Sequence, residues 1–136
     1  MSESDQQIAF FQWLELNLLK HPAYLLIYAV PNGGQRHIAV ATKLKKEGVK
    51  AGVWDIAVDW PSGGYHGLRI EMKHGKNKLT EQQEVWGVRY REAGYDTVVC
   101  YDWMSAVEAL KSYLEKDDGK NKTRKTDGRK RFNLPS

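Results

Sequence analysis

The sequence of 136 residues is poor in cysteine and in long apolar runs, and both shortages restrict what the protein can be. Its single cysteine, Cys100, cannot form an internal disulfide and lies in the apolar run 97–101. We therefore expect a buried, inert thiol in a reducing cytoplasm. No apolar run approaches the roughly 20 residues that a membrane-spanning helix needs, and the polar, acidic start lacks the regions of a signal peptide. We expect a cytoplasmic protein without a membrane partner.

The net charge of +4 is unevenly distributed along the chain. Residues 1–115 hold 13 basic and 14 acidic residues, whereas residues 116–136 hold 8 basic residues and 3 aspartates. The second segment also has no core-forming residue before Phe132. We predict one globular domain over 1–115 and a basic, flexible tail over 116–136. Such a tail suits contact with nucleic acid but does not by itself establish it.

Apolar periodicity and turn residues predict alternating helices and strands. Helices are expected over 3–19, 36–47, 80–93 and 103–114, and strands over 24–30, 53–58, 68–73 and 96–101. The strand over 24–30 should be buried. In the first helix an apolar stripe recurs at helical spacing, made of Ile8, Phe11, Leu14 and Leu18 and widened by Phe10 and Trp13. The third helix should supply apolar contacts through Val85, Trp86, Val88 and Tyr90, and the last helix carries Met104, Val107, Leu110 and Leu114 on one face. This order predicts an α/β domain with a four-stranded mixed sheet flanked by helices.

The two strands predicted within 52–73 carry three polar residues that could form a site. Side chains alternate between the faces of a strand, so Glu71 and Lys73 share one face. If the two strands pair, Asp55 comes beside Glu71. Two carboxylates and an amine suit a hard cation such as Mg²⁺, with the lysine orienting water or stabilising charge on a phosphate. A solvated strand face with a surface ion pair explains the same pattern, and both interpretations stay open at this point.

Five ordered sequence blocks resemble one protein family. They are Pro31-Asn32-Gly33-Gly34, Leu44 to Gly48, Gly52-Val53-Trp54-Asp55, Glu71-Met72-Lys73 and Leu79-Thr80-Glu81-Gln82-Gln83. Over residues 3–114 their order and spacing are similar to the VRR-NUC domain of the PD-(D/E)xK nuclease superfamily. One departure is Trp54, which stands where the family usually has proline. Since that proline is not a metal ligand, we expect the departure to change the local turn and to leave the metal site intact.

The resemblance implies a restriction-endonuclease-like fold and a Mg²⁺- or Mn²⁺-dependent endonuclease that hydrolyses DNA. By this resemblance Asp55 and Glu71 would hold the metal together with the backbone carbonyl of Met72. Lys73 would position or activate the attacking water. The cation would neutralise the phosphate in the transition state.

Two further residues have both a structural and a catalytic interpretation. Gln83 fits the N3 position of a capping box with Thr80, and the matching glutamine of the family belongs to its active site. Glu3 lies four residues before Gln7 and therefore on the same helix face. Many relatives carry an acidic residue and a glutamine at this spacing, so the resemblance makes Glu3 a further candidate metal ligand. A solvated first helical turn is the alternative.

DNA is the expected partner, and its phosphates would meet polar and basic residues around the site. The candidates are Asn32, Arg36, Lys43, Lys46, Lys76, Lys78, Arg129, Lys130 and Arg131. The small stand-alone members that the chain resembles are homodimers that act on branched DNA such as four-way junctions, in bacterial or phage-infected cells. The alternative is a non-catalytic nucleic-acid-binding protein on a nuclease-like fold. A solvated basic face is the ordinary interpretation of the lysines.

Overall fold

The computed structural model describes residues 1–31 and 37–116. Its helices are α1 (Glu3–Leu18), α2 (Ile38–Lys46), α3 (Glu81–Glu92) and α4 (Trp103–Leu114), with a short 3-10 helix η1 (Tyr24–Leu26). Its strands are β1 (Ile27–Ala29), β2 (Ile56–Val58), β3 (Leu68–Met72) and β4 (Asp96–Cys100). None of these helices is long and apolar enough to cross a membrane.

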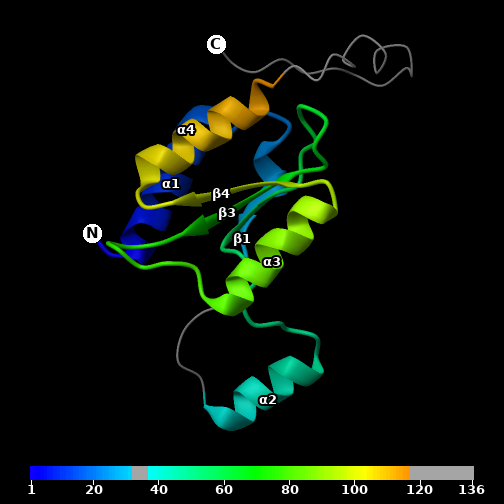
Figure 1. Cartoon of the computed structure of the whole chain (residues 1–136). Helices are drawn as coiled ribbons and strands as arrows, with labels where there is room; N and C mark the ends of the chain where they lie inside the picture. The colour runs from blue at the N-terminus through cyan, green and yellow to red at the C-terminus, as the bar shows by residue number, and fades with distance from the viewer. Residues whose placement is uncertain (32–36, 117–136) are drawn as a thin grey trace.

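The four strands form one mixed sheet in the order β1-β2-β3-β4. β1 pairs antiparallel with β2, and β2 pairs antiparallel with β3. β4 is parallel to β3, so the chain must cross from one end of the sheet to the other, and α3 makes this connection (Figure 1). The predicted four-stranded mixed sheet flanked by helices is confirmed.

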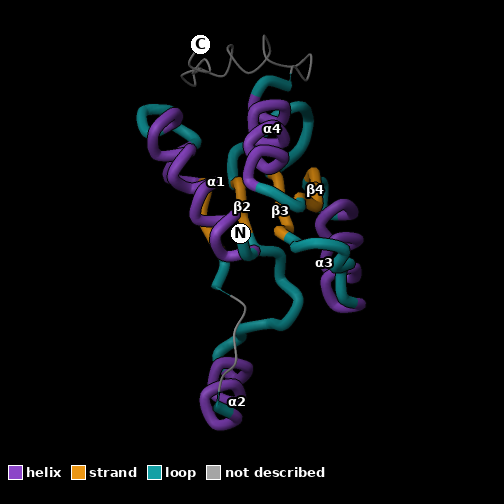
Figure 2. The backbone as a smooth tube through the Cα atoms, turned by 90° about the vertical axis from the view of Figure 1, so that its left-hand side faces the viewer, coloured by secondary structure: helices purple, strands orange, loops and turns teal. Residues whose placement is uncertain are grey.

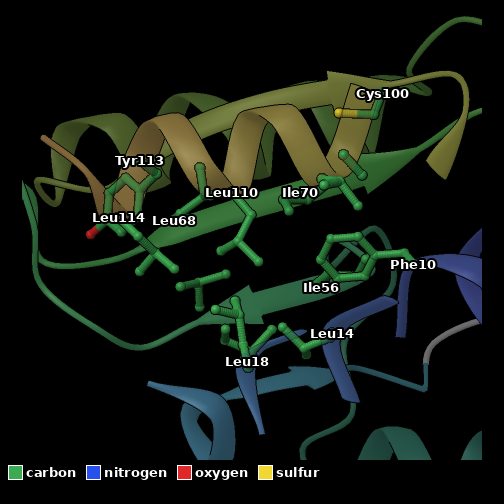
Figure 3. Packing of buried hydrophobic residues seen from close by; sticks show 14 of the residues in the cluster. Phe10, Leu14, Leu18, Ile56, Leu68, Ile70, Cys100, Leu110, Tyr113 and Leu114 are labelled. Carbon is green, nitrogen blue, oxygen red and sulfur yellow. The ribbon is translucent and has the colours of Figure 1, made fainter. Parts of the chain in front are cut away.

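One face of the sheet carries the hydrophobic core, which α1 and α4 cover. Phe10, Leu14 and Leu18 of α1 and Leu110 of α4 pack against the sheet residues of that face, which are Ile56, Val58, Leu68, Ile70 and Met72 (Figure 3). All of these side chains are at most 7% exposed. Alternation along β3 therefore sends Leu68, Ile70 and Met72 to this core and Arg69 and Glu71 to the opposite face.

The opposite face of the sheet is covered by α3, as Figures 1 and 2 show. There the guanidinium of Arg69 lies over the rings of Tyr90 and Tyr95, at 5.4 and 4.5 Å from their centroids. Arg69 also pairs with Asp59 at 3.0 Å, and Asp59 accepts a hydrogen bond from Tyr28 at 2.6 Å. The sheet is therefore a middle layer, and Glu71 lies in the polar layer between β3 and α3.

Helix α2 stands away from these layers. Figure 2 shows it beyond the end of the sheet, and none of its residues is buried. The segment that carries it leaves the sheet at Val30 and returns at Asp55, which are joined because the N–H of Val30 donates to the carbonyl of Asp55 at 2.8 Å. Helix α2 therefore lies on a projecting segment, the α2 arm, whose two ends meet beside Asp55.

The buried strand predicted over 24–30 is confirmed only in part. After Pro22 the N–H groups of Tyr24 and Leu26 donate to carbonyls three residues earlier, at 3.0 and 2.9 Å, which closes the 3-10 turn of η1. Only Ile27–Ala29 remains as strand, and it lies at the edge of the sheet with Tyr28 44% exposed.

Four apolar helix residues of the prediction are exposed to a large extent. Ile8, Val85, Val88 and Met104 are between 46% and 58% exposed. In α1 the buried residues are Phe10, Leu14 and Leu18, and all three belong to the predicted stripe. The expectation for Cys100 is confirmed in its structural part, because the thiol is 2% exposed and burial raises its pKa to about 11.

Candidate functional site

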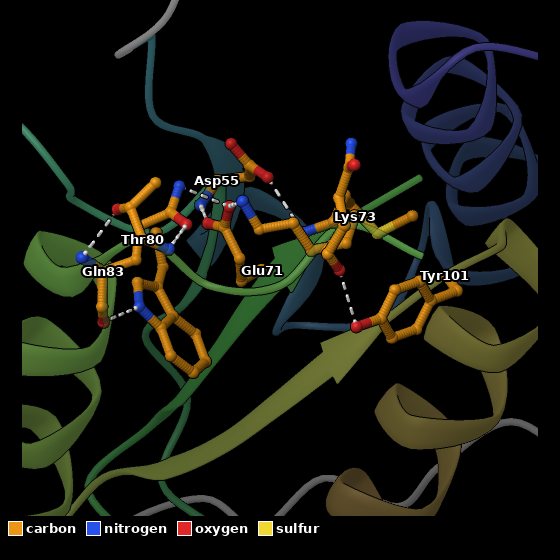
Figure 4. A network of polar contacts seen from close by, with 9 residues as sticks. Asp55, Glu71, Lys73, Thr80, Gln83 and Tyr101 are labelled. Carbon is orange, nitrogen blue, oxygen red and sulfur yellow. Dashed lines mark hydrogen bonds and ion pairs between the residues drawn. The ribbon is translucent and has the colours of Figure 1, made fainter. Parts of the chain in front are cut away.

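The hairpin of β2 and β3 brings Asp55 and Glu71 together. Asp55 directly precedes β2, and its N–H donates to Oε1 of Glu71 at 3.2 Å. In return Oδ2 of Asp55 accepts from the N–H of Met72 at 2.9 Å (Figure 4). The aspartate side chain thus continues the hydrogen-bond ladder of β3 at the point where β2 has no further strand residue. This exchange fixes the relative position of the two carboxylates.

Lys73 completes the cluster, and the cluster is buried. Its ammonium Nζ lies 3.8 Å from Oε2 of Glu71. Glu71 is 2% exposed and Lys73 is 8% exposed, so the interpretation of a solvated strand face with a surface ion pair is wrong. Two ionised groups lose hydration when they are buried, and their attraction only partly compensates. A buried ion pair at a strand end therefore indicates a functional site more strongly than a surface ion pair does.

Gln83 joins the helix α3 to the carboxylates. Its Oε1 accepts from the N–H of Thr80 at 2.9 Å, and its own N–H donates to Oγ1 of Thr80 at 3.2 Å, so the predicted capping box is confirmed. At the same time Nε2 of Gln83 donates to Oε2 of Glu71 at 2.9 Å. The capping role therefore does not exclude the predicted site role, because the amide oxygen caps the helix while the amide nitrogen contacts the carboxylate of Glu71.

The electrostatics of the cluster disfavour two negative charges. Burial, and then the charge of Asp55, raise the pKa of Glu71 to about 8. Burial is also the main cause that raises the pKa of Asp55. The charge of Glu3 raises both pKa values further, and the ammonium of Lys73 lowers both. One lysine cannot balance the carboxylates, so the site favours a proton or a cation between them.

A divalent cation of the Mg²⁺ type suits this donor set. Among the described residues no group of three or more His, Cys, Asp or Glu side chains could hold a metal ion by itself. Mg²⁺, however, is usually held by one or two carboxylates and keeps several waters. Asp55 and Glu71 supply two carboxylates. The carbonyl of Met72 points to the same edge of β3 as its N–H, which faces Asp55, because both groups of one strand residue point to the same side.

Of the remaining predicted residues, Glu3 acts on the cluster by its charge, four lysines lie exposed on the surface, and five residues lie outside the described part of the chain. Glu3 opens α1 and is half-buried, and its charge acts on both carboxyls, as the resemblance implied for a residue near the site. Lys43 and Lys46 are exposed on α2. Lys76 and Lys78 are exposed in the loop after β3, which the hydroxyl of Tyr101 anchors by donating to the carbonyl of Asn77 at 2.9 Å. Asn32, Arg36, Arg129, Lys130 and Arg131 lie outside the described residues.

Sequence reasoning missed one residue that is coupled to the site. The indole Nε1 of Trp54 donates to the backbone carbonyl of Gln83 at 2.8 Å, and the side chain is 1% exposed. Trp54 therefore packs in the interior. The only signal in the sequence was that this position departs from the proline that is usual in the resembled family.

Comparison with known proteins supports the resemblance that the motifs carry. No family model and no curated protein matches the chain. Among solved structures, a chain described as a VRR_NUC domain protein matches with a TM-score of 0.73 and 28% sequence identity. The match covers 87% of this chain and 94% of that chain. The VRR-NUC resemblance and the nuclease-like α/β fold are confirmed.

Proposed function

We propose that this VRR-NUC-like chain is a metal-dependent endonuclease that hydrolyses phosphodiester bonds in DNA. The observation that carries the proposal is the buried cluster of Asp55, Glu71 and Lys73 on the β2–β3 hairpin. Its two carboxyls have raised pKa values, so the cluster is suited to a cation that would relieve their repulsion. The fold likeness to a VRR_NUC domain protein gives this cluster its nuclease context.

Each residue of the cluster has a role in the proposed reaction. Asp55, Glu71 and the carbonyl of Met72 would hold Mg²⁺ or Mn²⁺, and the charge of Glu3 adds to the attraction. When bound, the metal supplies charge stabilisation to the phosphate and to the leaving oxygen. Lys73, held beside Glu71, donates a hydrogen bond to the attacking water and offsets developing negative charge.

Gln83 has a supporting role in this scheme. Its Nε2–H group holds Oε2 of Glu71, while the N–H of Asp55 holds Oε1. A carboxylate that is held at both oxygens cannot rotate freely, so its lone pairs stay in one orientation. Removing such a partner of a metal ligand typically lowers metal affinity or activity by about 10- to 100-fold.

Contact with DNA would extend from the cluster to the basic residues around it. The α2 arm carries Lys43 and Lys46, and the loop after β3 carries Lys76 and Lys78. Phosphate contacts of this kind position a duplex without reading its sequence. We further propose a homodimer that cuts branched DNA, because two sites related by a two-fold axis can cut opposing strands of a four-way junction. In such an interface Leu16 and Leu25, each 85% exposed, are available apolar groups.

A cleavage assay with labelled single-stranded, duplex, flap, splayed-arm and four-way-junction DNA tests the proposal. We expect cleavage with Mg²⁺ or Mn²⁺, and loss of cleavage in Asp55→Asn and Lys73→Ala with an unchanged circular dichroism spectrum. Lys111→Ala is the matched control, because this lysine lies exposed on α4 and should retain full activity. Full activity of either site variant would refute the assignment. Metal-independent DNA binding without any cleavage by the wild type would favour the non-catalytic alternative.

A further inference from the structure

A closed circuit of hydrogen bonds joins Trp54 to the carboxylate pair. The indole of Trp54 donates to the carbonyl of Gln83 at 2.8 Å, and the side-chain amide of Gln83 donates to Oε2 of Glu71 at 2.9 Å. Oε1 of Glu71 then accepts from the N–H of Asp55 at 3.2 Å, and Asp55 follows Trp54 in the chain. Because the circuit closes, α3 cannot shift along the strands without breaking one of these three bonds.

The packing around the indole shows that α3 is shaped to receive it. Trp54 lies edge-on to Tyr90, with ring centroids 6.0 Å apart. Beneath it, α3 has a glycine in mid-helix, Gly87, where a Cβ would lie 2.9 Å from Cζ2 of Trp54. Glycine is unfavourable inside a helix, so the space that the indole occupies is the physical reason for it here.

The segment before Trp54 lies equally close to the helix. Gly52 has a φ of +85°, and a Cβ at this position would lie 2.8 Å from the Cβ of Gln82. Only a residue without a side chain allows this approach in this backbone conformation. The loop that leads into β2 is therefore held against the first two turns of α3, where Gln83 is located.

We propose that Trp54 is a positioning residue of the nuclease site. By holding the carbonyl of Gln83, it sets the position of α3 from which the amide of Gln83 fixes Glu71. This inference rests on the proposed function, because it takes Glu71 as a metal ligand. Removing a hydrogen-bond partner that orients a metal ligand typically lowers metal affinity or activity by about 10- to 100-fold. Since Trp54 acts on Glu71 through Gln83, we expect the lower end of this range.

A second tryptophan on the same surfaces provides a matched control. Nε1 of Trp86, in α3, donates to the carbonyl of Ala51 at 2.9 Å. This bond also joins α3 to the loop before β2, but it does not pass through Gln83 or the carboxylates. Trp86→Phe therefore removes a comparable indole bond between the same two segments while leaving the circuit intact.

The decisive measurement is Mn²⁺ binding to wild type, Trp54→Phe and Trp86→Phe, by calorimetry or by the paramagnetic resonance of free Mn²⁺. We expect an affinity about tenfold lower in Trp54→Phe and unchanged in Trp86→Phe. In cleavage, kcat should fall in Trp54→Phe while KM for DNA stays constant, because Trp54 does not touch the substrate. Equal Mn²⁺ affinity in wild type and Trp54→Phe would overturn the inference alone. A wild type that binds no Mn²⁺ would refute the proposed function as well.

Two measurements on the metal-free protein test the circuit directly. The side-chain amide resonance of Gln83 should shift in Trp54→Phe and stay in place in Trp86→Phe. Gly87→Ala should lower the Tm of the wild type, because the new Cβ meets the indole, and raise the Tm of Trp54→Phe, where Cζ2 is absent. An unshifted Gln83 amide in Trp54→Phe, or the same effect of Gly87→Ala in both backgrounds, would contradict the proposed docking.

Discussion

The carboxyl of Glu71 should make the stability of the metal-free protein depend on pH, and Glu71→Gln should remove this contribution while that of Asp55 remains. Burial, and then Asp55, raise the pKa of Glu71 from 4.5 to about 8. Because the folded protein holds this proton more tightly than the unfolded chain does, the free energy of unfolding falls as pH rises from 4.5 to about 8. One proton gives a slope of at most about 1.4 kcal/mol per pH unit, so the total loss is on the order of 4 kcal/mol.

Glu71→Gln removes the charge and also one hydrogen bond. The carboxylate accepts from the N–H of Asp55 and from Nε2 of Gln83, whereas a glutamine at position 71 has one oxygen for two donors. This loss costs about 1 kcal/mol at every pH. We therefore expect the variant to be less stable than wild type by about 1 kcal/mol near pH 4, equally stable near pH 5, and more stable by on the order of 3 kcal/mol above pH 8.

Denaturant unfolding in EDTA between about pH 4 and pH 8.5, followed by circular dichroism, measures this crossover. The difference between the two curves cancels the contribution of His21, whose pKa is lowered by burial and whose effect on stability has the opposite sign. Glu108→Gln, at an exposed position of α4, is the control and should leave the pH profile of the wild type unchanged. Parallel curves for wild type and Glu71→Gln would refute the reasoning. Mn²⁺ at pH 8 should stabilise the wild type and not this variant.

Three further predictions follow from the tail, the symmetry and the thiol. Deleting residues 117–136 removes seven basic residues and three aspartates, so DNA binding should weaken while metal-dependent cleavage survives. Each lost phosphate contact should flatten the slope of log K against log salt by about 0.9, and an unchanged slope would show that the tail does not touch DNA. Light scattering should give a dimer, and junctions labelled on both strand pairs should show paired cuts; a monomer that nicks duplex equally well would contradict this. Cys100 should react with a thiol reagent only on unfolding, and rapid labelling of the native protein would contradict its burial.

Local patterns predicted those parts of the site that depend on neighbours in the chain. The capping box of Thr80 and Gln83 spans three residues, so its spacing alone predicts both bonds. Strand alternation likewise placed Glu71 and Lys73 on one face, and hairpin pairing brought Asp55 to them. What alternation cannot predict is whether a helix covers that face. Here Gln83 of α3 contacts Glu71 from that face, and α3 is the crossover that the parallel pairing of β3 and β4 requires.

The features that sequence could not predict arise from contacts between distant residues. The bond from Trp54 to Gln83 joins positions 29 residues apart, and no periodicity relates them. In 24–30 the β-branched and aromatic residues favour a strand. The turn after Pro22, however, uses the N–H groups of Tyr24 and Leu26 for its own hydrogen bonds, so only three residues form β1. In residues 24–30 the turn geometry thus outweighs strand propensity, whereas the bond between Trp54 and Gln83 depends on tertiary packing.

The position of α3 links metal affinity, proton affinity and stability in one structural feature. Glu71 is 2% exposed, and a lower effective dielectric strengthens both the repulsion between the carboxylates and their attraction for a divalent ion. The same helix supplies Gln83, and Trp54 holds it in place. A variant that loosens α3 should therefore lower the pKa of Glu71 and weaken metal binding. It should also reduce the loss of stability of the metal-free protein at high pH. The repulsion between the carboxylates of Asp55 and Glu71, which destabilises the metal-free protein at high pH, is therefore the same interaction that would favour the binding of a cation.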